Sequence, residues 1–427
     1  MPRVAVPLLL ALTTLASAAH GAPPHTEAAA GRARYDGHRV YRVQPASSRH
    51  VAILQEIQRR YPQLDFWTQP VAISRPVDVM VPPELQEQIT ETFNGYAISY
   101  SIFIDDVQRL IDNESPHRQR AAGFDWTDYY PLENVYSWLD SLVEQYPGVV
   151  SSVVIGSTFE GREQRGVKIS FGDGKPVVFL ESGAHAREWI TVATATYIVN
   201  ELLTSTNATF RALVESFDWY VVPSTNPDGY EYTHTSNRMW RKTRSQSNDR
   251  LCVGTDPNRN WDYYWLDEGA SAISCSETYA GPSVFSEVET RTLSEFLQSI
   301  SGDLLVYLSL HSYSQLLMIP YGLNYERPDN YDELMEIGGK AVDALKQRYG
   351  TQYQYGTIYD IIYPAAGGSI DWVKKALGTR FVFEWELRDE GQYGFLLPAD
   401  QIVPTALETI DSMVAILQEA VARTASR

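Results

Sequence analysis

The sequence is poor in cysteine and in basic residues, and each shortage excludes a class of protein. Only two cysteines occur among 427 residues, so the chain is no disulfide-dense scaffold. Lys and Arg total 35 against 53 acidic residues, which gives a net charge of -18. This balance argues against a nucleic-acid partner, which needs a cationic surface. The 44% hydrophobic and 12% aromatic content fits an ordinary globular protein with room for a large domain and a smaller one.

Long apolar runs are also scarce, and the one at residues 4–15 is too short to span a bilayer. We therefore expect no membrane partner. Arg3 precedes this run and Ala16-Ser17-Ala18 follows it, a combination typical of a signal peptide over residues 1–18. The sequence thus predicts a secreted, extracellular protein, with a buried N-terminal helix as the alternative.

Secretion affects how three other positions are interpreted. In an oxidising compartment Cys252 and Cys275 are expected to form a disulfide, worth about 3 kcal/mol on the chain-entropy view. Two unpaired core cysteines are the alternative. Asn207-Ala208-Thr209 is a sequon between a helix and the next element, so Asn207 is the expected glycosylation site.

The first hundred residues after the signal predict a small α+β domain of the ferredoxin-like type. Residues 38–104 show the order strand, helix, strand, strand, helix, strand, at 39–43, 51–61, 65–68, 77–81, 83–93 and 97–103. No plausible catalytic cluster occurs there. A polar linker follows at about 112–123, where Arg118 and Arg120 suit a trypsin-like protease. We expect residues 19–120 to be an activation propeptide that covers the active cleft until it is removed.

The remainder, residues 121–427, predicts a catalytic α/β domain. Its helices alternate with apolar strands, which favours a central mixed, mostly parallel sheet with helices on both faces. We expect strands at 149–155, 167–171, 177–181, 219–222, 304–310 and 380–385, and helices at 132–145, 191–203, 286–298, 331–349 and 400–422. Residues 237–281 are predicted to be a long loop, which on such a sheet is usually functional.

Histidines at strand ends indicate a metal site. Of eight histidines only His185 has an acidic residue three positions on, Glu188, and this pair follows the strand predicted at 177–181. His311 directly follows the strand at 304–310, although alone it could be a core histidine. A catalytic zinc takes three protein ligands and keeps one position for water, which His185, Glu188 and His311 would fit. Another metal stays possible, but the donor set suits zinc best.

A third strand supplies two acids. In Phe-Val-Phe-Glu-Trp-Glu, at 381–386, alternation places Glu384 and Glu386 on one face of an otherwise apolar strand. Two carboxylates there are costly to bury, so they line a cleft, bind a cation or lie at a sheet edge. We expect Glu386 to act as the base that takes a proton from water at the zinc.

Several arginines lie in the same segments as these residues. Arg187, Arg241 and Arg259 could each be solvated surface residues. Together near a zinc ion they would serve two needs. They would bind an anionic substrate end and stabilise a tetrahedral oxyanion.

Six sequence blocks in order carry a resemblance to a known family. They are GAHAREW at 183–189, NRMWRKTRS at 237–245, CVGTDPNRNWD at 252–262, SLHSYSQLL at 309–317, IIYPAAGGSIDW at 361–372 and ELRDEGQYGFLLP at 386–398. The chain resembles the secreted zinc metallocarboxypeptidases of the pancreatic carboxypeptidase A and B family, in precursor form, over about residues 38–420. The resemblance implies a proenzyme with one zinc ion per chain that cleaves the last residue from peptides.

The resemblance also implies residue roles. The zinc ligands would be His185, Glu188 and His311, the general base Glu386, and the oxyanion-binding residue Arg241. Asn258 and Arg259 would grip the substrate carboxylate under Tyr363, and Asp256 would orient a ligand histidine. Further substrate contacts would come from Arg187, Ser312, Tyr313 and Ile370. The disulfide Cys252–Cys275 belongs to the same pattern. We expect a monomer whose partners are peptide and protein C-termini and a trypsin-like activating protease.

Side-chain preference depends on a few pocket positions. By the resemblance the pocket is lined by Met318, Gly322, Ile358, Ile362, Ala365, Gly368 and Ile370. B-type enzymes carry an acid at the position of Ile370, so isoleucine predicts the A-type preference for apolar and aromatic ends. Glu384 departs from the A-type pattern, which has threonine there. It could admit basic side chains or raise the pKa of Glu386 by repulsion.

Two other classes of function remain to be weighed. A non-catalytic homologue could use the cleft only to bind peptide ends, but the full set of catalytic residue types argues against it. A serine hydrolase is disfavoured, because no Gly-x-Ser-x-Gly elbow occurs and His234 has no evident serine and acid partners. His234 is expected to be structural or solvent-facing.

Overall fold

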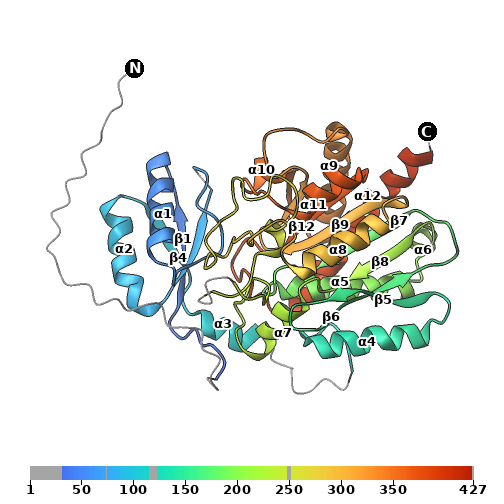
Figure 1. Ribbon diagram of the computed structural model, residues 1–427, viewed down its shortest axis with the longest axis horizontal. Coiled ribbons are helices and arrows are strands. Elements are labelled where there is room, and N and C mark those ends of the chain that lie inside the picture. The colour runs from blue at the N-terminus through green and yellow to red at the C-terminus, as the bar shows by residue number, and fades with distance from the viewer. Residues whose placement is uncertain (1–30, 74, 115–122, 248–251, 426–427) are drawn as a thin grey trace. The chain divides into compact units, whose positions relative to one another are not determined.

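The computed structural model describes residues 31–73, 75–114, 123–247 and 252–425 (Figure 1). The predicted signal peptide and most of the predicted linker, residues 115–122, lie outside the described residues. Among the described residues, no helix combines the length and apolar character needed to cross a bilayer.

The first domain is a four-stranded antiparallel sheet with helices on one face. The strands run in the order β2-β3-β1-β4, with β1 at Arg39–Gln44, β2 at Asp65–Phe66, β3 at Val77–Val81 and β4 at Ser99–Ile104. The helices are α1 (Ser48–Arg60), η1 (Pro83–Leu85) and α2 (Gln86–Gly95). Leu54, Ile57, Ile89 and Phe93 of the helices pack against the sheet. The expected order of elements is confirmed, although β2 is shorter than predicted.

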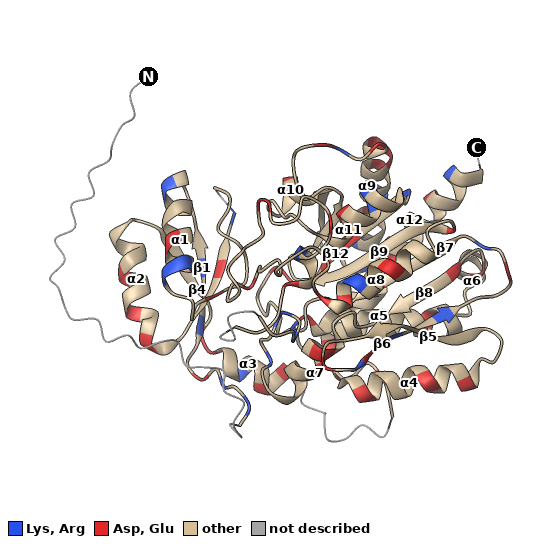
Figure 2. Ribbon diagram, in the orientation of Figure 1, with Lys and Arg blue, Asp and Glu red and all other residues tan. Residues whose placement is uncertain are grey.

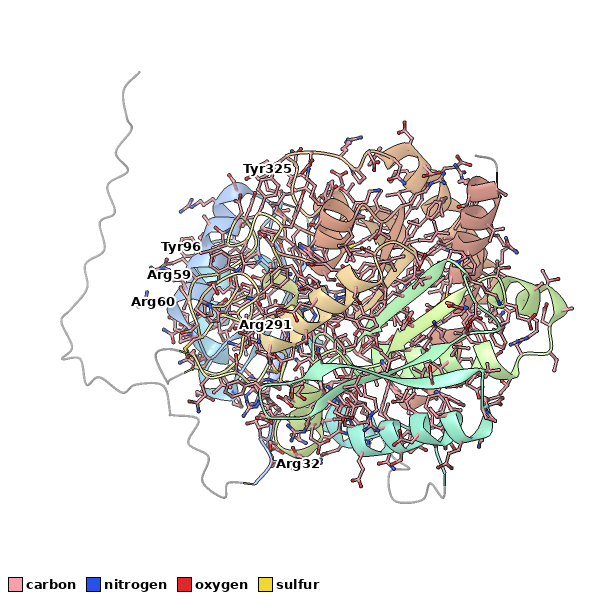
Figure 3. All side chains as sticks on the ribbon, turned by 45° about the vertical axis from the view of Figure 1, so that its right-hand side comes forward. Arg32, Arg59, Arg60, Tyr96, Arg291 and Tyr325 are labelled. Carbon is pink, nitrogen blue, oxygen red and sulfur yellow. A yellow bond between two sulfur atoms is a disulfide. The ribbon has the colours of Figure 1, made fainter. Side chains whose placement is uncertain are left out.

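The outer surface of this helical layer is polar and negatively charged in part. Arg59, Arg60 and Tyr96 are exposed along it (Figure 3). Acidic residues of α2, and of α4 (Leu132–Gln145) in the second domain, face outward without any Lys or Arg in either helix (Figure 2).

The opposite face of the first sheet carries Val40, Trp67 and Met80, which pack against the second domain. The first domain therefore contacts the second through its sheet, by way of apolar side chains.

The second domain has an eight-stranded mixed sheet in the order β11-β10-β12-β9-β7-β8-β6-β5. Four central strands, β12, β9, β7 and β8, are mutually parallel. The bounds are β5 (Val150–Ser157), β6 (Glu163–Ile169), β7 (Val177–Ser182), β8 (Asp218–Val222), β9 (Leu304–Ser312), β10 (Leu316–Ile319), β11 (Gln354–Thr357) and β12 (Phe381–Leu387). The predicted mixed α/β fold is confirmed, and the two four-residue strands β10 and β11 were not expected.

Helices cover both faces of this sheet because its strands are apolar on both sides. One face carries α4, α5 (Trp189–Thr204), α9 (Tyr331–Tyr349) and α12 (Ile402–Ala425), whose apolar residues form one core cluster with Phe381, Phe383 and Trp385. The other face carries α8 (Val288–Ser299), whose Leu293 and Leu297 belong to a second core cluster that also contains Val382. The remaining elements are α3 (Val107–Glu114), α6 (Ala208–Val214), α7 (Pro227–Thr235), η2 (Pro257–Arg259), α10 (Ile358–Ile361), α11 (Ser369–Trp372), the π-helical turn η3 (Val373–Leu377) and η4 (Ala399–Gln401).

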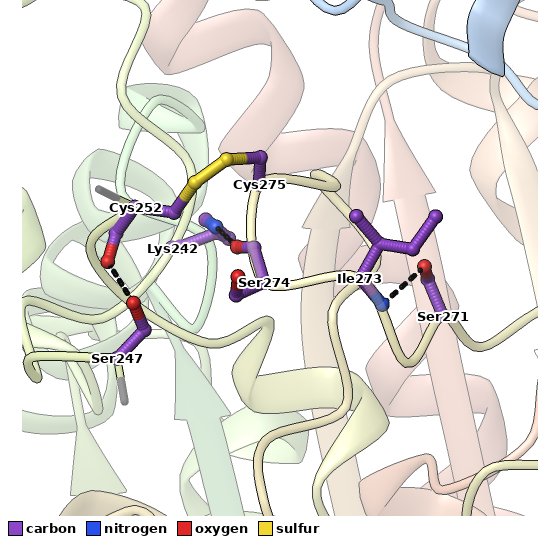
Figure 4. Close-up of a disulfide and its surroundings, with 7 residues drawn as sticks. All are labelled: Lys242, Ser247, Cys252, Ser271, Ile273, Ser274 and Cys275. Atoms are coloured by element: carbon purple, nitrogen blue, oxygen red, sulfur yellow. Dashed lines mark hydrogen bonds between the residues drawn. A yellow bond between two sulfur atoms is a disulfide. The ribbon is translucent and has the colours of Figure 1, made fainter. Parts of the chain in front are cut away.

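The long loop predicted at 237–281 is present, and its described part holds only the short helix η2 and isolated β-bridges. The expected disulfide between Cys252 and Cys275 joins positions 23 residues apart (Figure 4). Next to it, Lys242 donates from Nζ to the Ser274 carbonyl oxygen at 2.8 Å. The alternative of two unpaired cysteines is therefore wrong. The disulfide and the hydrogen bond of Lys242 together fix this part of the loop.

One buried carboxyl on α8 makes the stability of this fold depend on pH. Glu289 is 2% exposed, and its Oε1 accepts from the Phe159 backbone N–H at 3.0 Å. Burial, only partly offset by this hydrogen bond, raises the pKa of Glu289 to about 7. Native Glu289 thus keeps its proton at pH values where the unfolded chain has lost it. Stability falls as pH rises from near the unfolded pKa toward 7.

We therefore expect Glu289→Gln to stabilise the protein at pH 8 by up to about 3 kcal/mol and to have little effect near pH 4.5. Urea unfolding of both proteins at the two pH values measures the difference. Glu295→Gln, at an exposed position of the same helix, is the matched control and should show no such pH-dependent gain. An equal effect of Glu289→Gln at both pH values would contradict this account.

Candidate metal and catalytic site

Three parallel strands bring the predicted site residues to one edge of the large sheet. β9 and β12 pair so that His311 lies directly beside Glu386. β7 is the other parallel neighbour of β9, and His185 follows its end by three residues. Glu188 occupies the position just before α5. β12 lies between β9 and β10. The alternative that Glu384 and Glu386 lie at a sheet edge is therefore wrong.

His185, Glu188 and His311 form a compact group of possible metal ligands. One ligand atom from each lies within 4.8 Å of the others. His185 Nδ1 is 2.8 Å from Glu188 Oε1, and His311 Nδ1 is 3.2 Å from Glu188 Oε2. The two Nδ1 atoms face each other at 3.1 Å. Two imidazoles and one carboxylate directed at a common point fit a zinc ion with an open fourth position.

Asp256 sets the orientation of His185. The Asp256 carboxylate is fully buried, and its Oδ1 lies 3.0 Å from His185 Nε2. Burial would raise the pKa of Asp256, but Arg241 and His185 hold it well below its usual value. An ionised Asp256 accepts a hydrogen bond from the Nε2–H of His185, and this tautomer leaves Nδ1 free to bind metal.

The charges around the ligands are unbalanced in a direction that a cation would correct. Burial alone would lower the pKa of His311, but Glu384, Glu188 and Glu386 raise it to about 10. Burial and the neighbouring Glu188 raise the pKa of Glu386 well above its usual value. Burial also raises the pKa of Glu384. A divalent ion at the three ligands would favour the ionised form of each nearby carboxylate.

A cavity opens beside the ligands. Most of the predicted site residues line it, namely His185, Glu188, Arg241, Asn258, Arg259, Ser312, Tyr313, Tyr363, Ile370 and Glu386. Of the predicted pocket residues, Met318, Ile358, Ile362, Ala365 and Gly368 also line it, and so does Glu384. Gly322 is not among the lining residues; its backbone N–H donates to Asp371 Oδ2 at 2.8 Å.

Arg241 and Arg259 line the cavity and Arg187 does not, but all three are fixed by polar contacts. Arg241 donates from Nη2 to Asp256 Oδ2 at 2.8 Å, and Arg259 donates from Nη1 to the Asn258 carbonyl at 2.7 Å. Arg187 is only 1% exposed and donates from Nη1 to Asp65 Oδ2 of the first domain at 2.7 Å. His234 does not belong to the site; it is buried and stacks on Trp189 with ring centroids 4.0 Å apart.

The first domain supplies residues that sequence patterns did not reveal. Trp67 and Thr68 line the cavity. Asp78 of β3 accepts a hydrogen bond from the Tyr313 hydroxyl at 2.7 Å and from Arg42 Nε at 2.8 Å. An acid inside the apolar strand Val77–Val81 was a signal that this strand faces a polar partner.

Comparison with known proteins agrees with this geometry. Residues 135–412 match the zinc carboxypeptidase family model, and residues 41–114 match the carboxypeptidase activation peptide. The chain belongs to the zinc carboxypeptidase family. As predicted, it is a metallocarboxypeptidase that uses zinc and carries an activation propeptide.

Relatives of this carboxypeptidase cover most of its length. It is 46% identical over 400 residues to zinc carboxypeptidase A 1 of Anopheles gambiae, covering 92% of each chain. It is 40% identical to carboxypeptidase A1 of Homo sapiens, covering 91% of this chain and 95% of that one. Its fold matches the crystal structure of thrombin activatable fibrinolysis inhibitor with a TM-score of 0.85 at 32% identity, over 91% of this chain and 100% of that one.

Zinc binding can be tested on the full chain. We expect wild type to bind one zinc ion, and His311→Ala to bind it at least about 100-fold more weakly, because a ligand is lost. Asp256→Asn should weaken binding by about 10- to 100-fold, because His185 loses its orienting acceptor. Competition with a chromogenic chelator measures the affinities. His50→Ala, in α1 of the first domain, is the control, and wild-type affinity in His311→Ala would refute the ligand assignment.

Proposed function

We propose that this chain is the precursor of a secreted, monomeric carboxypeptidase that releases single apolar or aromatic residues from peptide C-termini. The observation that carries the proposal is the convergence of two histidines and Glu188 beside a cavity that also contains Glu386 and two held arginines. The signal-like residues 1–18 and the disulfide favour secretion. The fully buried Ile370 in the cavity wall favours apolar side chains.

Substrate binding would begin with the terminal carboxylate. Arg259 is held by hydrogen bonds to the carbonyl oxygens of Asn258 and Gly269, so its guanidinium meets a carboxylate with little further loss of entropy. Asn258 accepts from the Ser369 backbone N–H at 2.9 Å through Oδ1, which orients its amide beside Arg259. The ring of Tyr363 lies 5.8 Å from the Arg259 guanidinium carbon and would close over the bound end.

The chemical step would then use Arg241 and Glu386. When bound, zinc supplies a Lewis acid that polarises the scissile carbonyl and makes water more acidic. Arg241, fixed by Asp256 and kept charged, would stabilise the negative charge that develops on the carbonyl oxygen. Glu386 would take a proton from the attacking water and deliver it to the leaving nitrogen. Its Oε2 accepts no hydrogen bond among the described residues, which leaves it available for that transfer.

The propeptide would act by occupying the approach to this cavity. Trp67 and Thr68 stand in its wall, and Asp65 and Asp78 occupy Arg187 and Tyr313, two of the proposed substrate contacts. The linker was predicted at about 112–123, but its residues 112–114 belong to α3. A trypsin-like cut at Arg118 or Arg120, beyond this helix, would free the first domain.

Asn207 is the proposed glycosylation site. It is exposed at the start of α6. Its Oδ1 accepts from the backbone N–H groups of Thr209 and Phe210, which leaves the amide nitrogen to carry the glycan.

Activation is the first test. Trypsin treatment of the zinc-loaded full chain should raise the release of C-terminal Phe from a peptide by about 100-fold, which corresponds to a closed state favoured by about 2.7 kcal/mol. The double variant Arg118→Gln, Arg120→Gln should resist this activation. Full activity of the uncut chain would contradict an inhibitory propeptide, and activation of the double variant would contradict the cut site.

The role of Glu386 is the second test. In the activated protein Glu386→Gln should lower kcat for C-terminal release by about 10³- to 10⁴-fold, within the range of general acid–base catalysis. Zinc content and unfolding temperature should stay near the wild-type values. The control is Glu390→Gln at an exposed position four residues on, which should remain active. Turnover that survives in Glu386→Gln would show that another group is the base. Zinc binding without turnover in the activated wild type would instead indicate a non-catalytic peptide-binding homologue.

A further inference from the structure

The cavity contains one carboxylate, Glu384, that the proposed reaction does not use. Glu384 lies on β12 two residues before Glu386, on the same face of the strand, and is 4% exposed. In the sheet it pairs with Met318 of β10, and both residues line the cavity together with Ile370. A buried acid therefore stands among the apolar residues that would contact a substrate side chain.

The hydroxyl group that lies between Glu384 and Glu181 in the sheet serves Glu181. Across three neighbouring strands Glu181, Ser309 and Glu384 lie side by side in register. The Ser309 hydroxyl, between the two acids, donates to Glu181 Oε1 at 3.0 Å. The Ser369 hydroxyl donates to the same oxygen at 2.7 Å. Glu181 is thus satisfied by protein donors, whereas Glu384 Oε2 accepts no hydrogen bond from the described residues.

No basic side chain of the described residues forms an ion pair with Glu384 apart from His311, whose Nε2 is 3.7 Å from Oε2. That distance is too long for a hydrogen bond. Arg241 is directed to Asp256, and Arg259 to the carbonyl oxygens of Asn258 and Gly269. A buried acceptor without a donor is costly, and in a substrate pocket it points to a donor that the ligand brings.

We propose that Glu384 recognises the cationic end of a C-terminal lysine or arginine side chain, so that the pocket takes basic as well as apolar residues. The inference rests on the proposed carboxypeptidase function. The aliphatic stem of either residue would pack on Met318, Ile358 and Ile370, as an apolar substrate side chain does. Its ammonium or guanidinium group would donate charge-assisted hydrogen bonds to Glu384.

The experiment uses the trypsin-activated, zinc-loaded protein and matched peptides ending in Phe, Leu, Lys or Arg. Wild type should release Lys and Arg with kcat/KM within about tenfold of Phe. Glu384→Gln should lower the ratio of Lys to Phe release by about 100-fold, since the charge that pairs with Lys is lost while an amide of equal size remains. Glu384→Thr should change the ratio in the same direction, and it serves if the glutamine variant folds poorly.

Glu181→Gln is the matched control, because it removes an equal charge from the same row of the sheet at a position that does not line the cavity. Its ratio of Lys to Phe release should equal the wild-type ratio. Zinc affinity of each variant is measured in parallel. If both Glu384 variants lose Phe and Lys release by one common factor together with zinc affinity, Glu384 positions His311 and the proposal is overturned.

The remaining outcomes separate this inference from the function beneath it. Release of Phe and Leu without release of Lys or Arg by wild type overturns the role of Glu384 and leaves the carboxypeptidase function intact. Failure of the zinc-loaded, cut wild type to release any C-terminal residue overturns the proposed function itself. A Lys-to-Phe ratio that falls in Glu384→Gln and holds in Glu181→Gln supports the inference.

Discussion

The concentration of like charge at one end of the central strands is the constraint on which the site depends. Glu188, Glu384 and Glu386 surround His311 closely enough to raise the pKa of its imidazole to about 10. Three carboxylates this close together are costly to bury unless a cation compensates their charge. A zinc ion meets this need, and Arg241 with Asp256 balances the charge on the other side of the ligands. Each ligand must be deprotonated to bind the metal, so metal binding and the stability of the site depend on the same charges.

The propeptide interface is built from two kinds of contact with different consequences. Val40, Trp67 and Met80 of the first domain form an apolar cluster with Tyr313 and Phe395 of the second. Burial of this apolar surface stabilises the contact between the two domains. The polar contacts, Asp65 with Arg187 and Asp78 with Tyr313, set the register of the two surfaces. In the proposed activation, a cut in the linker would let Arg187 and Tyr313 become hydrated or bind substrate. While the linker is intact, the high effective concentration of the first domain keeps it bound at such an interface. Once the linker is cut, the first domain can dissociate.

The sequence predicted the elements that are strongly apolar and long enough to be recognised. The strand expected at 177–181 is Val177–Ser182, and the helix expected at 191–203 is Trp189–Thr204. β10 and β11 were missed because four residues are too few to show alternation. The grouping of His185, Glu188 and His311 followed from their positions at the ends of parallel strands. The pairing of Asp65 with Arg187 did not, because the two lie 122 positions apart and no periodic pattern links them.

Strand alternation and register explain how three acids in neighbouring positions come to have different surroundings. Glu384 and Glu386 point to the same side of β12, and Glu181 projects on β7 beyond the intervening Ser309. The hydroxyl between the strands can satisfy only one neighbour, and it donates to Glu181. Glu386 lies two residues beyond Glu384 on β12, directly beside His311. The backbone thus fixes which acid accepts hydrogen bonds from the protein. In the proposed reaction it also fixes which acid would face the attacking water and which would be left for the substrate side chain.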